Sequence, residues 1–247
     1  MKNLLQNHPF AVEAFFKSSL ILTFAAPIKQ LQAILPICLT VDGFKERWGF
    51  VAVAIVQTKN LRPKGFHKAL GKNFFLIGYR IFVRYNNTDG KNLRGLFILK
   101  SETNKKEMEL LGNIFTKYSY STTDIVTENN DDGLYRVKSI QSDLDIVVNT
   151  KEAEVQLPHS SPFKDWKEAR RFAGPLPYTF SYDDVTKEVL IIEGVRQNWT
   201  PHPVKVINHH IGYLTGHEFG NLSLANAFLI ENIPYYWKKG KIEQWQS

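Results

Sequence analysis

The segment from residue 48 to 58 restricts the fold most, because it reads as a strand with two apolar faces. Side chains alternate between the two faces of a strand. Both alternating sets here contain only apolar or small residues, namely Trp48, Phe50, Ala52 and Ala54 on one face and Gly49, Val51, Val53 and Ile55 on the other. A strand of this kind is covered on both sides. The chain therefore has to place further structure against each face of it.

The spacing of the prolines allows long paired strands in the middle of the chain. None of the 11 prolines lies between Pro63 and Pro158, and proline interrupts the hydrogen-bond ladder of a sheet. Turn sequences at Asp42-Gly43 and at residues 87–90 separate neighbouring apolar runs. Strands are predicted at residues 20–25, 38–41, 48–58, 74–85, 93–100, 119–127, 134–137, 144–148, 176–182, 188–194 and 204–210.

Short helices are predicted at residues 9–17, from Pro27 to about residue 35, from a capping box at Asn104 and Glu107 to Phe115, and from Ser161-Pro162 to Gly174-Pro175. About ten strands and three or four short helices indicate a mainly β, β-rich α+β fold. It would be a sandwich or a closed barrel with the helices outside. No repeat and no linker divides the sequence, so residues 1–247 are predicted to form a single domain.

Composition excludes several classes of protein. Of the 247 residues, 43% are hydrophobic and 22% are charged, which is ordinary for a globular protein and excludes intrinsic disorder. Cys38 is the only cysteine, so neither an internal disulfide nor a four-cysteine zinc site can form. The longest apolar run, residues 20–28, is far shorter than the ~20 residues of a membrane span. We expect a cytoplasmic protein that does not bind a membrane.

Positive charge exceeds negative charge, with 31 Lys and Arg against 24 Asp and Glu and a formal net charge of +7. Five of the basic residues fall within residues 59–72, namely Lys59, Arg62, Lys64, Lys68 and Lys72. Such a cluster is either a solvated surface or a patch for nucleic acid or anionic lipid. The solvated surface is the favoured interpretation, so no nucleic-acid partner is expected.

The histidines near the C-terminus do not form a convincing metal site. His209 and His210 are adjacent, and adjacent residues of a strand point to opposite faces. His217-Glu218 lacks the second histidine of a zinc-binding helix, because Asn221 stands at that position. We therefore expect no metal and no cofactor.

Four stretches resemble a known family. They are Leu35-Pro36 with LTVDGF at 39–44, FFLIGYRIFV at 74–83, GLFIL at 95–99, and Thr116-Lys117-Tyr118. In these stretches the chain is similar to the YqjF-like family of bacterial proteins, which shares the fold of acetoacetate decarboxylase. The similarity extends from about residue 20 to about residue 200. It implies an antiparallel β-barrel or clam that encloses an internal pocket.

The resemblance also implies what the pocket lacks. In the decarboxylase a pocket lysine forms a Schiff base with a β-keto acid, and a second lysine lowers its pKa. This sequence has Tyr118 and Ser119 where the lysine pair would stand, and Leu76 where the family has a glutamate. Lys117 is one residue away, which in a strand means the opposite face. Schiff-base decarboxylation is therefore not expected.

The resemblance places five residues in the pocket as ligand-binding candidates: Gly78, Arg80, Phe82, Tyr118 and Glu193. Arg80 could grip a carboxylate with two hydrogen bonds, or it could pair with a structural carboxylate in the core. Tyr118 could hydrogen-bond a carbonyl oxygen, or it could be a core tyrosine. Gly78 would leave space for a ligand. Glu193 is either a pocket group or a surface residue at a strand end.

The favoured hypothesis is a protein that binds a small organic acid or carbonyl compound in an internal pocket. One alternative is a lyase or hydrolase that uses Arg80, Glu193 and Tyr118 in acid–base chemistry. A third possibility, from another class, is a basic adaptor that binds nucleic acid or membrane through residues 59–72. The sequence leaves catalysis and oligomeric state open, a homo-oligomer included.

Overall fold

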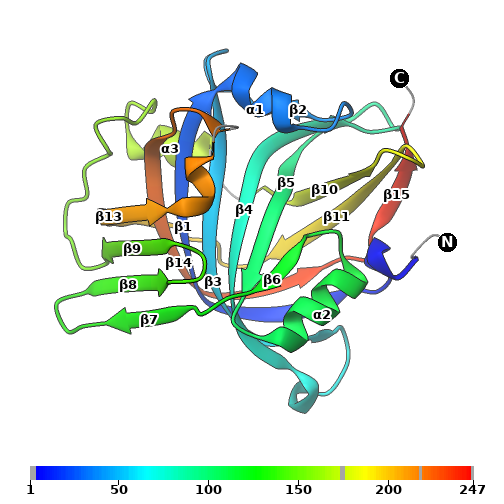
Figure 1. Cartoon of the computed structure of the whole chain (residues 1–247), viewed down its shortest axis with the longest axis horizontal. Helices are drawn as coiled ribbons and strands as arrows, with labels where there is room; N and C mark the ends of the chain where they lie inside the picture. The colour runs from blue at the N-terminus through cyan, green and yellow to red at the C-terminus, as the bar shows by residue number, and fades with distance from the viewer. Residues whose placement is uncertain (1–3, 173–175, 217–218, 246–247) are drawn as a thin grey trace.

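The computed structural model describes residues 4–172, 176–216 and 219–245, and most of its strands belong to one 11-stranded sheet (Figure 1). The strands of this main sheet are β1 (Val12–Pro27), β2 (Thr40–Val41), β3 (Trp48–Pro63), β4 (Lys72–Asn86), β5 (Asn92–Thr103), β6 (Tyr120–Thr122), β10 (Tyr178–Asp183), β11 (Glu188–Arg196), β12 (His202–Pro203), β14 (Ser223–Trp237) and β15 (Lys241–Gln244). A second sheet has four strands in the order β13 (Lys205–Ile211), β9 (Leu144–Asn149), β8 (Leu134–Ser139) and β7 (Val126–Asn129).

The main sheet curls into a closed ring. Its central order is β14-β1-β3-β4-β5-β10-β11, and β11 pairs again with β14 at the other end. The pairings β14–β1, β1–β3, β3–β4 and β4–β5 are antiparallel, whereas β10 pairs with β5 in parallel. The predicted mainly β fold is confirmed, with this one parallel junction in a ring that was expected to be antiparallel throughout.

The helices are short and lie at the periphery (Figure 1). The α-helices are α1 (Ile28–Ile34), α2 (Lys106–Phe115) and α3 (Trp166–Phe172), and the 3₁₀-helices are η1 (Leu4–Asn7), η2 (Lys68–Leu70) and η3 (Gly212–Thr215). Among the described residues, no helix has the length and apolar character required to cross a membrane.

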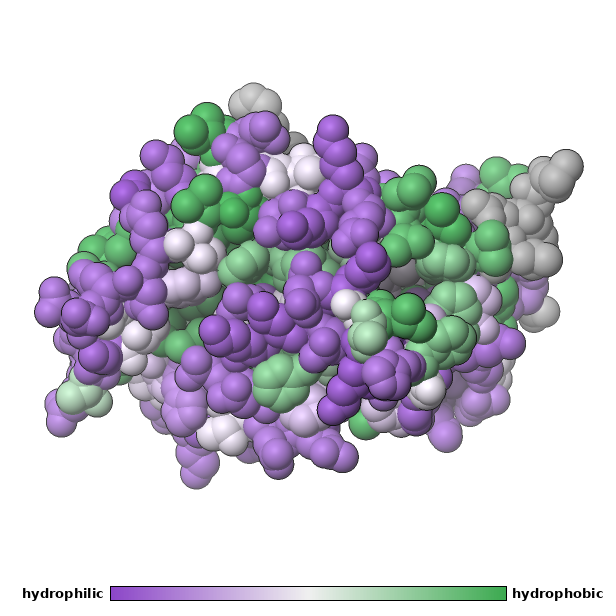
Figure 2. Space-filling model, turned by 90° about the horizontal axis from the view of Figure 1, so that it is seen from below, coloured by the Kyte–Doolittle hydropathy of each residue, from purple (hydrophilic) through white to green (hydrophobic). Residues whose placement is uncertain are grey.

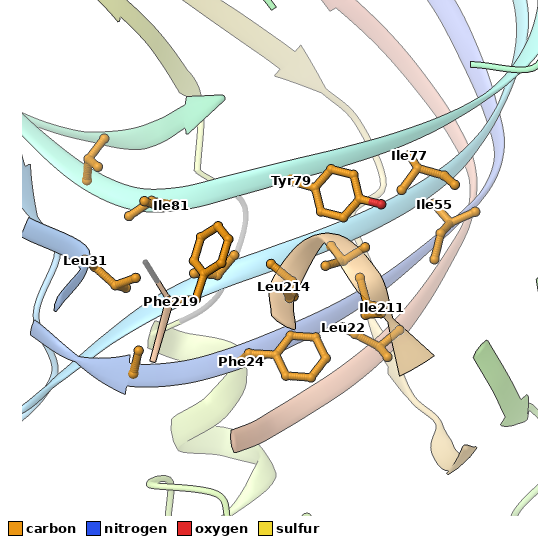
Figure 3. Packing of buried hydrophobic residues seen from close by; sticks show 14 of the residues in the cluster. Leu22, Phe24, Leu31, Ile55, Ile77, Tyr79, Ile81, Ile211, Leu214 and Phe219 are labelled. Atoms are coloured by element: carbon orange, nitrogen blue, oxygen red, sulfur yellow. The ribbon is translucent and has the colours of Figure 1, made fainter. Parts of the chain in front are cut away.

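The four-stranded sheet, called the outer sheet below, packs against the outside of the ring. A cluster of buried side chains joins β1, β3 and β4 to the outer sheet and to η3 (Figure 3). Its members include Leu22 and Phe24 of β1, Ile55 of β3, Ile77, Tyr79 and Ile81 of β4, and Ile211 and Leu214. Burial of this apolar surface stabilises the contact between the ring and the outer sheet.

The opposite faces of the same strands point into the ring. Phe50, Ala52, Ala54 and Val56 of β3 belong to a second buried cluster there, together with Phe82 of β4. At one end of the ring Phe44, Phe50, Phe163 and Phe172 form a group of touching rings, with neighbouring centroids 4.9–6.3 Å apart. The prediction that β3 is covered on both sides is confirmed.

The helix predicted at residues 9–17 is wrong. Residues 12–27 form β1, which pairs with β14 on one side and with β3 on the other. The buried residues Ala14 and Phe16 are two apart, as in a strand. Pairing along both edges outweighs the weak local helical preference of this segment. The strand that completes this pairing, β14, was not predicted.

Other element ends also differ from the predictions. The capping box at Asn104 does not form, since the Asn104 side chain accepts a hydrogen bond from the Phe75 N–H at 2.9 Å. Helix α3 begins at Trp166 because the Asp165 carboxylate accepts from the Glu168 N–H at 2.7 Å and caps the first turn. The strand predicted at 119–127 is divided between β6 and β7. The predicted stop at Gly174-Pro175 lies outside the described part of the chain.

Candidate functional site

A small cavity of about 110 Å³ lies inside the ring and is the candidate site. It is called the inner cavity below. Apolar side chains from β1, β3, β4 and β5 form most of its wall, and Leu176, Trp199 and Trp237 complete it. The polar groups that reach it are two arginines, three tyrosines, two serines and one threonine: Arg80, Arg196, Tyr118, Tyr120, Tyr235, Ser19, Ser101 and Thr179.

Arg80 projects from β4 into this cavity. It keeps some accessible surface because its guanidinium faces the hollow, yet protein surrounds it on all sides and desolvation lowers its pKa. Its Nε donates to no acceptor, and no carboxylate of the described residues forms an ion pair with it. Arginine nevertheless stays protonated in proteins. A buried cation without a counter-charge is costly unless a ligand supplies one.

Arg196, at the end of β11, lies near Arg80 in the same cavity. One of its terminal nitrogens donates to the Leu176 carbonyl at 2.7 Å. Its guanidinium carbon lies 4.7 Å from the centre of the Trp199 ring and 5.6 Å from that of Tyr235. Burial lowers the pKa of Arg196, and the positive charge of Arg80 lowers it further. The two cations thus repel each other, and a shared anion would relieve both.

A structural arginine in this fold looks different. The Asp42 carboxylate is fully buried and accepts from Arg84 Nε at 2.6 Å and from Arg94 Nε at 2.7 Å. In that cluster the protein supplies its own anion to both guanidinium groups. Arg80 differs from both, because no carboxylate among the described residues pairs with it.

Tyrosine hydroxyls provide the neutral polar groups of the cavity. Tyr118 and Thr179 share a hydrogen bond of 2.6 Å between their oxygens, and either can donate. The hydroxyls of Tyr120 and Tyr235 bond to no other described residue. Burial raises the pKa of Tyr120 to about 12, and it also raises the pKa of Tyr118 and of Tyr235. All three phenols therefore keep their protons at neutral pH and can donate to a ligand oxygen.

Two glycines make room for these polar side chains. A Cβ at Gly78 would lie 2.8 Å from Arg80 Nε, so the guanidinium occupies the space beside that glycine. A Cβ at Gly194 would overlap the Tyr235 hydroxyl. The absence of a side chain at these two positions leaves the space that the Arg80 guanidinium and the Tyr235 hydroxyl occupy.

A bulge in β5 lies directly opposite Arg80. Tyr79 pairs with Lys100 but Arg80 pairs with Ile98, so Leu99 is the extra residue. The bulge reverses the alternation of β5, which explains why Leu96, Ile98 and then Ser101 line the cavity. The serine hydroxyl thereby reaches the same space as the guanidinium.

The cavity wall limits the chemistry that the site can perform. Its described lining contains no lysine, histidine, cysteine or carboxylate. Lys117, the amine nearest in sequence, points elsewhere and pairs with Asp183 at 3.1 Å. The groups present can bind an anion and polarise a carbonyl, but among them no amine can form a Schiff base and no basic side chain is free to accept a proton at neutral pH.

The five predicted pocket residues fall into three groups. Arg80, Phe82 and Tyr118 line the cavity. Gly78 does not line it, because the Arg80 side chain fills the space that was predicted for a ligand. Glu193 lies outside, where it pairs with Lys238 at 2.8 Å. It is on the other face of β11 from Gly194 and Arg196, so its placement in the pocket is corrected.

Sequence reasoning missed Arg196, Tyr120 and Tyr235. An arginine just after the strand predicted at residues 188–194 was the one local signal of a polar position at Arg196. Its orientation, however, depends on the pairing of Arg196 with Tyr235 across β11 and β14. That pairing joins segments that are far apart in sequence and that no local pattern connects.

The other sequence features lie away from the inner cavity. In the basic cluster, Arg62 pairs with Glu13 at 2.7 Å and Lys72 pairs with Glu107 at 2.9 Å. His210 lies 2.8 Å from Asp143, while His209 packs against the Phe24 ring. No group of three potential metal ligands occurs among the residues that the structure describes.

Comparison with known proteins agrees with this architecture. The model of the DUF2071 family, described as "Uncharacterized conserved protein (COG2071)", matches residues 14–234. The structure is similar to acetoacetate decarboxylase from Legionella pneumophila, with a TM-score of 0.60, 10% identity, and coverage of 95% of this chain and 88% of that one. It is also similar to an acetoacetate decarboxylase-like enzyme from Sphingomonas wittichii, with a TM-score of 0.59 and 10% identity. That match covers 96% of this chain and 94% of the other.

A third similar structure is the enduracididine biosynthesis enzyme MppR complexed with pyruvate. Its TM-score is 0.52 at 9% identity, and the match covers 96% of this chain and 92% of that one. At these identities the likeness concerns the fold alone. No curated protein matches the sequence.

Proposed function

The chain belongs to the DUF2071 family and has an acetoacetate decarboxylase-like fold, and from its inner cavity we propose that it binds a small organic acid that carries a carbonyl group. The single observation that carries this proposal is the pair of buried cations, Arg80 and Arg196, in a cavity whose described lining holds no carboxylate. A ligand carboxylate can accept bidentate hydrogen bonds from a guanidinium.

The tyrosines indicate which group the ligand carries besides its carboxylate. Their protonated hydroxyls surround the space next to the guanidinium groups, where they can donate to a carbonyl oxygen. A carboxylate held by arginine and a carbonyl held by tyrosine together describe an oxo acid. MppR, a neighbour in fold, has been captured with pyruvate, a molecule of that class.

Lyase or hydrolase chemistry with Glu193 as the base has less support. The Glu193 carboxylate lies outside the inner cavity and is paired with Lys238. What remains in the described lining is suited to binding and polarisation rather than to proton transfer. The proposal is therefore a binding function, with any catalysis limited to a ligand that reacts when its carbonyl is polarised.

The proposal is tested by calorimetric titration of pyruvate and acetoacetate into the protein. We expect saturable 1:1 binding, with acetone, which lacks the carboxylate, at least about tenfold weaker. Arg80→Gln should weaken binding of the acids at least about tenfold. Two variants serve as controls that should bind as the wild type does: Arg170→Gln, which changes an exposed arginine, and Glu193→Gln. Equal binding by Arg80→Gln, or no binding of either acid, would overturn the proposal.

A further inference from the structure

A second cavity lies directly beside the inner one. It measures about 360 Å³ and is called the outer cavity below. Its walls come from the β3–β4 hairpin, from α2 and from the start of β1. Most of its lining is apolar, including Phe10, Leu61, Leu70, Met108, Leu111 and Phe115. Figure 2 views the molecule from below and shows several groups of apolar residues among the polar ones on this face.

The two cavities share one wall. Leu76, Tyr118, Tyr120 and Trp237 line both of them and form the wall that the two spaces share. Tyr120 is held there by helix α2. Its N–H donates to the Asn113 side chain at 2.8 Å, and its carbonyl accepts from the same side chain at 2.9 Å. Its ring lies against Gly112, where a Cβ would collide with it.

The charges of the outer cavity are neutralised within the protein. Arg62 and Lys72, the cations of its lining, pair with Glu13 and Glu107. His8 is buried, and desolvation lowers its pKa, which keeps its imidazole neutral at pH 7. The outer cavity therefore offers an apolar surface, whereas the inner cavity offers uncompensated positive charge.

Size separates the two cavities as clearly as polarity does. A cavity of about 150 Å³ accommodates benzene, with six heavy atoms. By that scale the 110 Å³ inner cavity holds about four or five heavy atoms, close to the carboxylate and neighbouring carbonyl group of a 2-oxo acid. The 360 Å³ outer cavity holds about 14. Any larger acid has to place its remaining atoms on the apolar side of the shared wall.

We infer that the ligand is an amphipathic oxo acid, with its carboxylate at Arg80 and Arg196 and an apolar chain or ring in the outer cavity beneath α2. This inference rests on the proposed function and specifies its ligand class. It requires an opening in the shared wall, formed either by a rotation of the Tyr120 or Leu76 side chain or by a gap beside these two side chains. Burial of each methylene of the chain then adds affinity.

The experiment is a titration of straight-chain 2-oxo acids of three, six and eight carbons, together with phenylpyruvate. For wild type we expect affinity to rise about two- to fourfold per methylene along the series. Leu111→Trp places a larger ring in the outer cavity and should weaken the eight-carbon acid at least about tenfold while it leaves pyruvate unchanged. Leu110→Trp is the matched control, since Leu110 is exposed and lines neither cavity. It should bind every acid as the wild type does.

The outcomes separate the inference from the proposal beneath it. If pyruvate binds and affinity does not rise with chain length, the inference fails and the proposed function stands. If the longer acids bind more tightly but Leu111→Trp and Leu110→Trp behave alike, the tail lies elsewhere and the inference fails. If no acid binds, both fail. The chain-length series on wild type decides the matter even where Leu111→Trp does not fold.

Discussion

The guanidinium of Arg80 lies against the backbone of Gly78, two residues earlier on the same face of β4. A methyl group added at Gly78 would stand only 2.8 Å from Arg80 Nε. The glycine therefore determines the position of the cation. It supplies the space in which the arginine side chain can fold while its charge faces the inner cavity.

Gly78→Ala should displace the guanidinium without unfolding the protein. The new methyl group would meet the mobile end of one side chain, so we expect the free energy of unfolding to change by less than about 1 kcal/mol. Carboxylate affinity should fall about tenfold, because a bidentate contact tolerates little displacement. Calorimetry and urea unfolding measure the two quantities. Unchanged affinity would show that Gly78 does not position the arginine.

Arg80→Met should make the protein more stable and unable to bind carboxylates. Methionine removes a buried charge that lacks a partner, and such replacements commonly stabilise by about 1–3 kcal/mol. Arg84→Met serves as the contrast, since it takes one donor from the buried Asp42 carboxylate and should cost about 1–3 kcal/mol. Urea unfolding of both variants checks the pair. A loss of stability in Arg80→Met would point to a structural arginine instead.

Acetoacetate should form no covalent adduct with the protein in the presence of borohydride. Attack on the carbonyl requires a neutral amine within the pocket, and the described lining of the inner cavity contains none. Lys117 is held by Asp183 outside the cavity. Intact mass spectrometry is the measurement. An adduct that maps to a single lysine would restore Schiff-base chemistry and the lyase alternative.

His8 should make stability fall as the solution is acidified. Burial lowers the pKa of His8 in the folded protein, so on acidification the unfolded chain binds a proton at this histidine before the folded chain does. The contribution of His8 to stability is present above its ordinary value of about 6.5 and decreases as the pH falls below it. His8→Asn removes the titrating group and suits the positive φ of 51° at this position.

The measurement is the urea midpoint at pH 7.5 and at pH 5.0. The difference between the two midpoints should shrink in His8→Asn. It should stay the same in His159→Asn, which changes an exposed histidine. An undiminished pH dependence in His8→Asn would mean that other groups account for it.

The strands next to each other in sequence were the ones that the sequence predicted well. β3, β4 and β5 follow one another along the chain and pair as neighbours, so local alternation and the residues of their short connections identify them. β1 and β14 pair across about 200 residues; residues 20–25 of β1 were predicted as a strand, but its first half and the whole of β14 were not. The strand preference of such a segment comes from packing against its partner strands, and the segment's own sequence does not show those contacts.

The site divides in the same way. Arg80 was assigned to the pocket by the resemblance, and the regular alternation of β4 keeps it on the same face as Phe82, which also lines the inner cavity. Arg196 and Tyr235 meet only because β11 and β14 close the ring. Glu193 was misplaced because the resemblance identified the strand correctly but not which of its faces points inward.

Ala52 and Ala54, on the inward face of β3, set the width of the inner cavity with side chains of one methyl group each. Neither residue is charged, and the cations stand on β4 and β11. Within this family, mutation at these alanines could change the size of the accepted ligand by one carbon at a time. The charge that anchors the ligand would persist through such changes, so selectivity and anchoring can evolve independently.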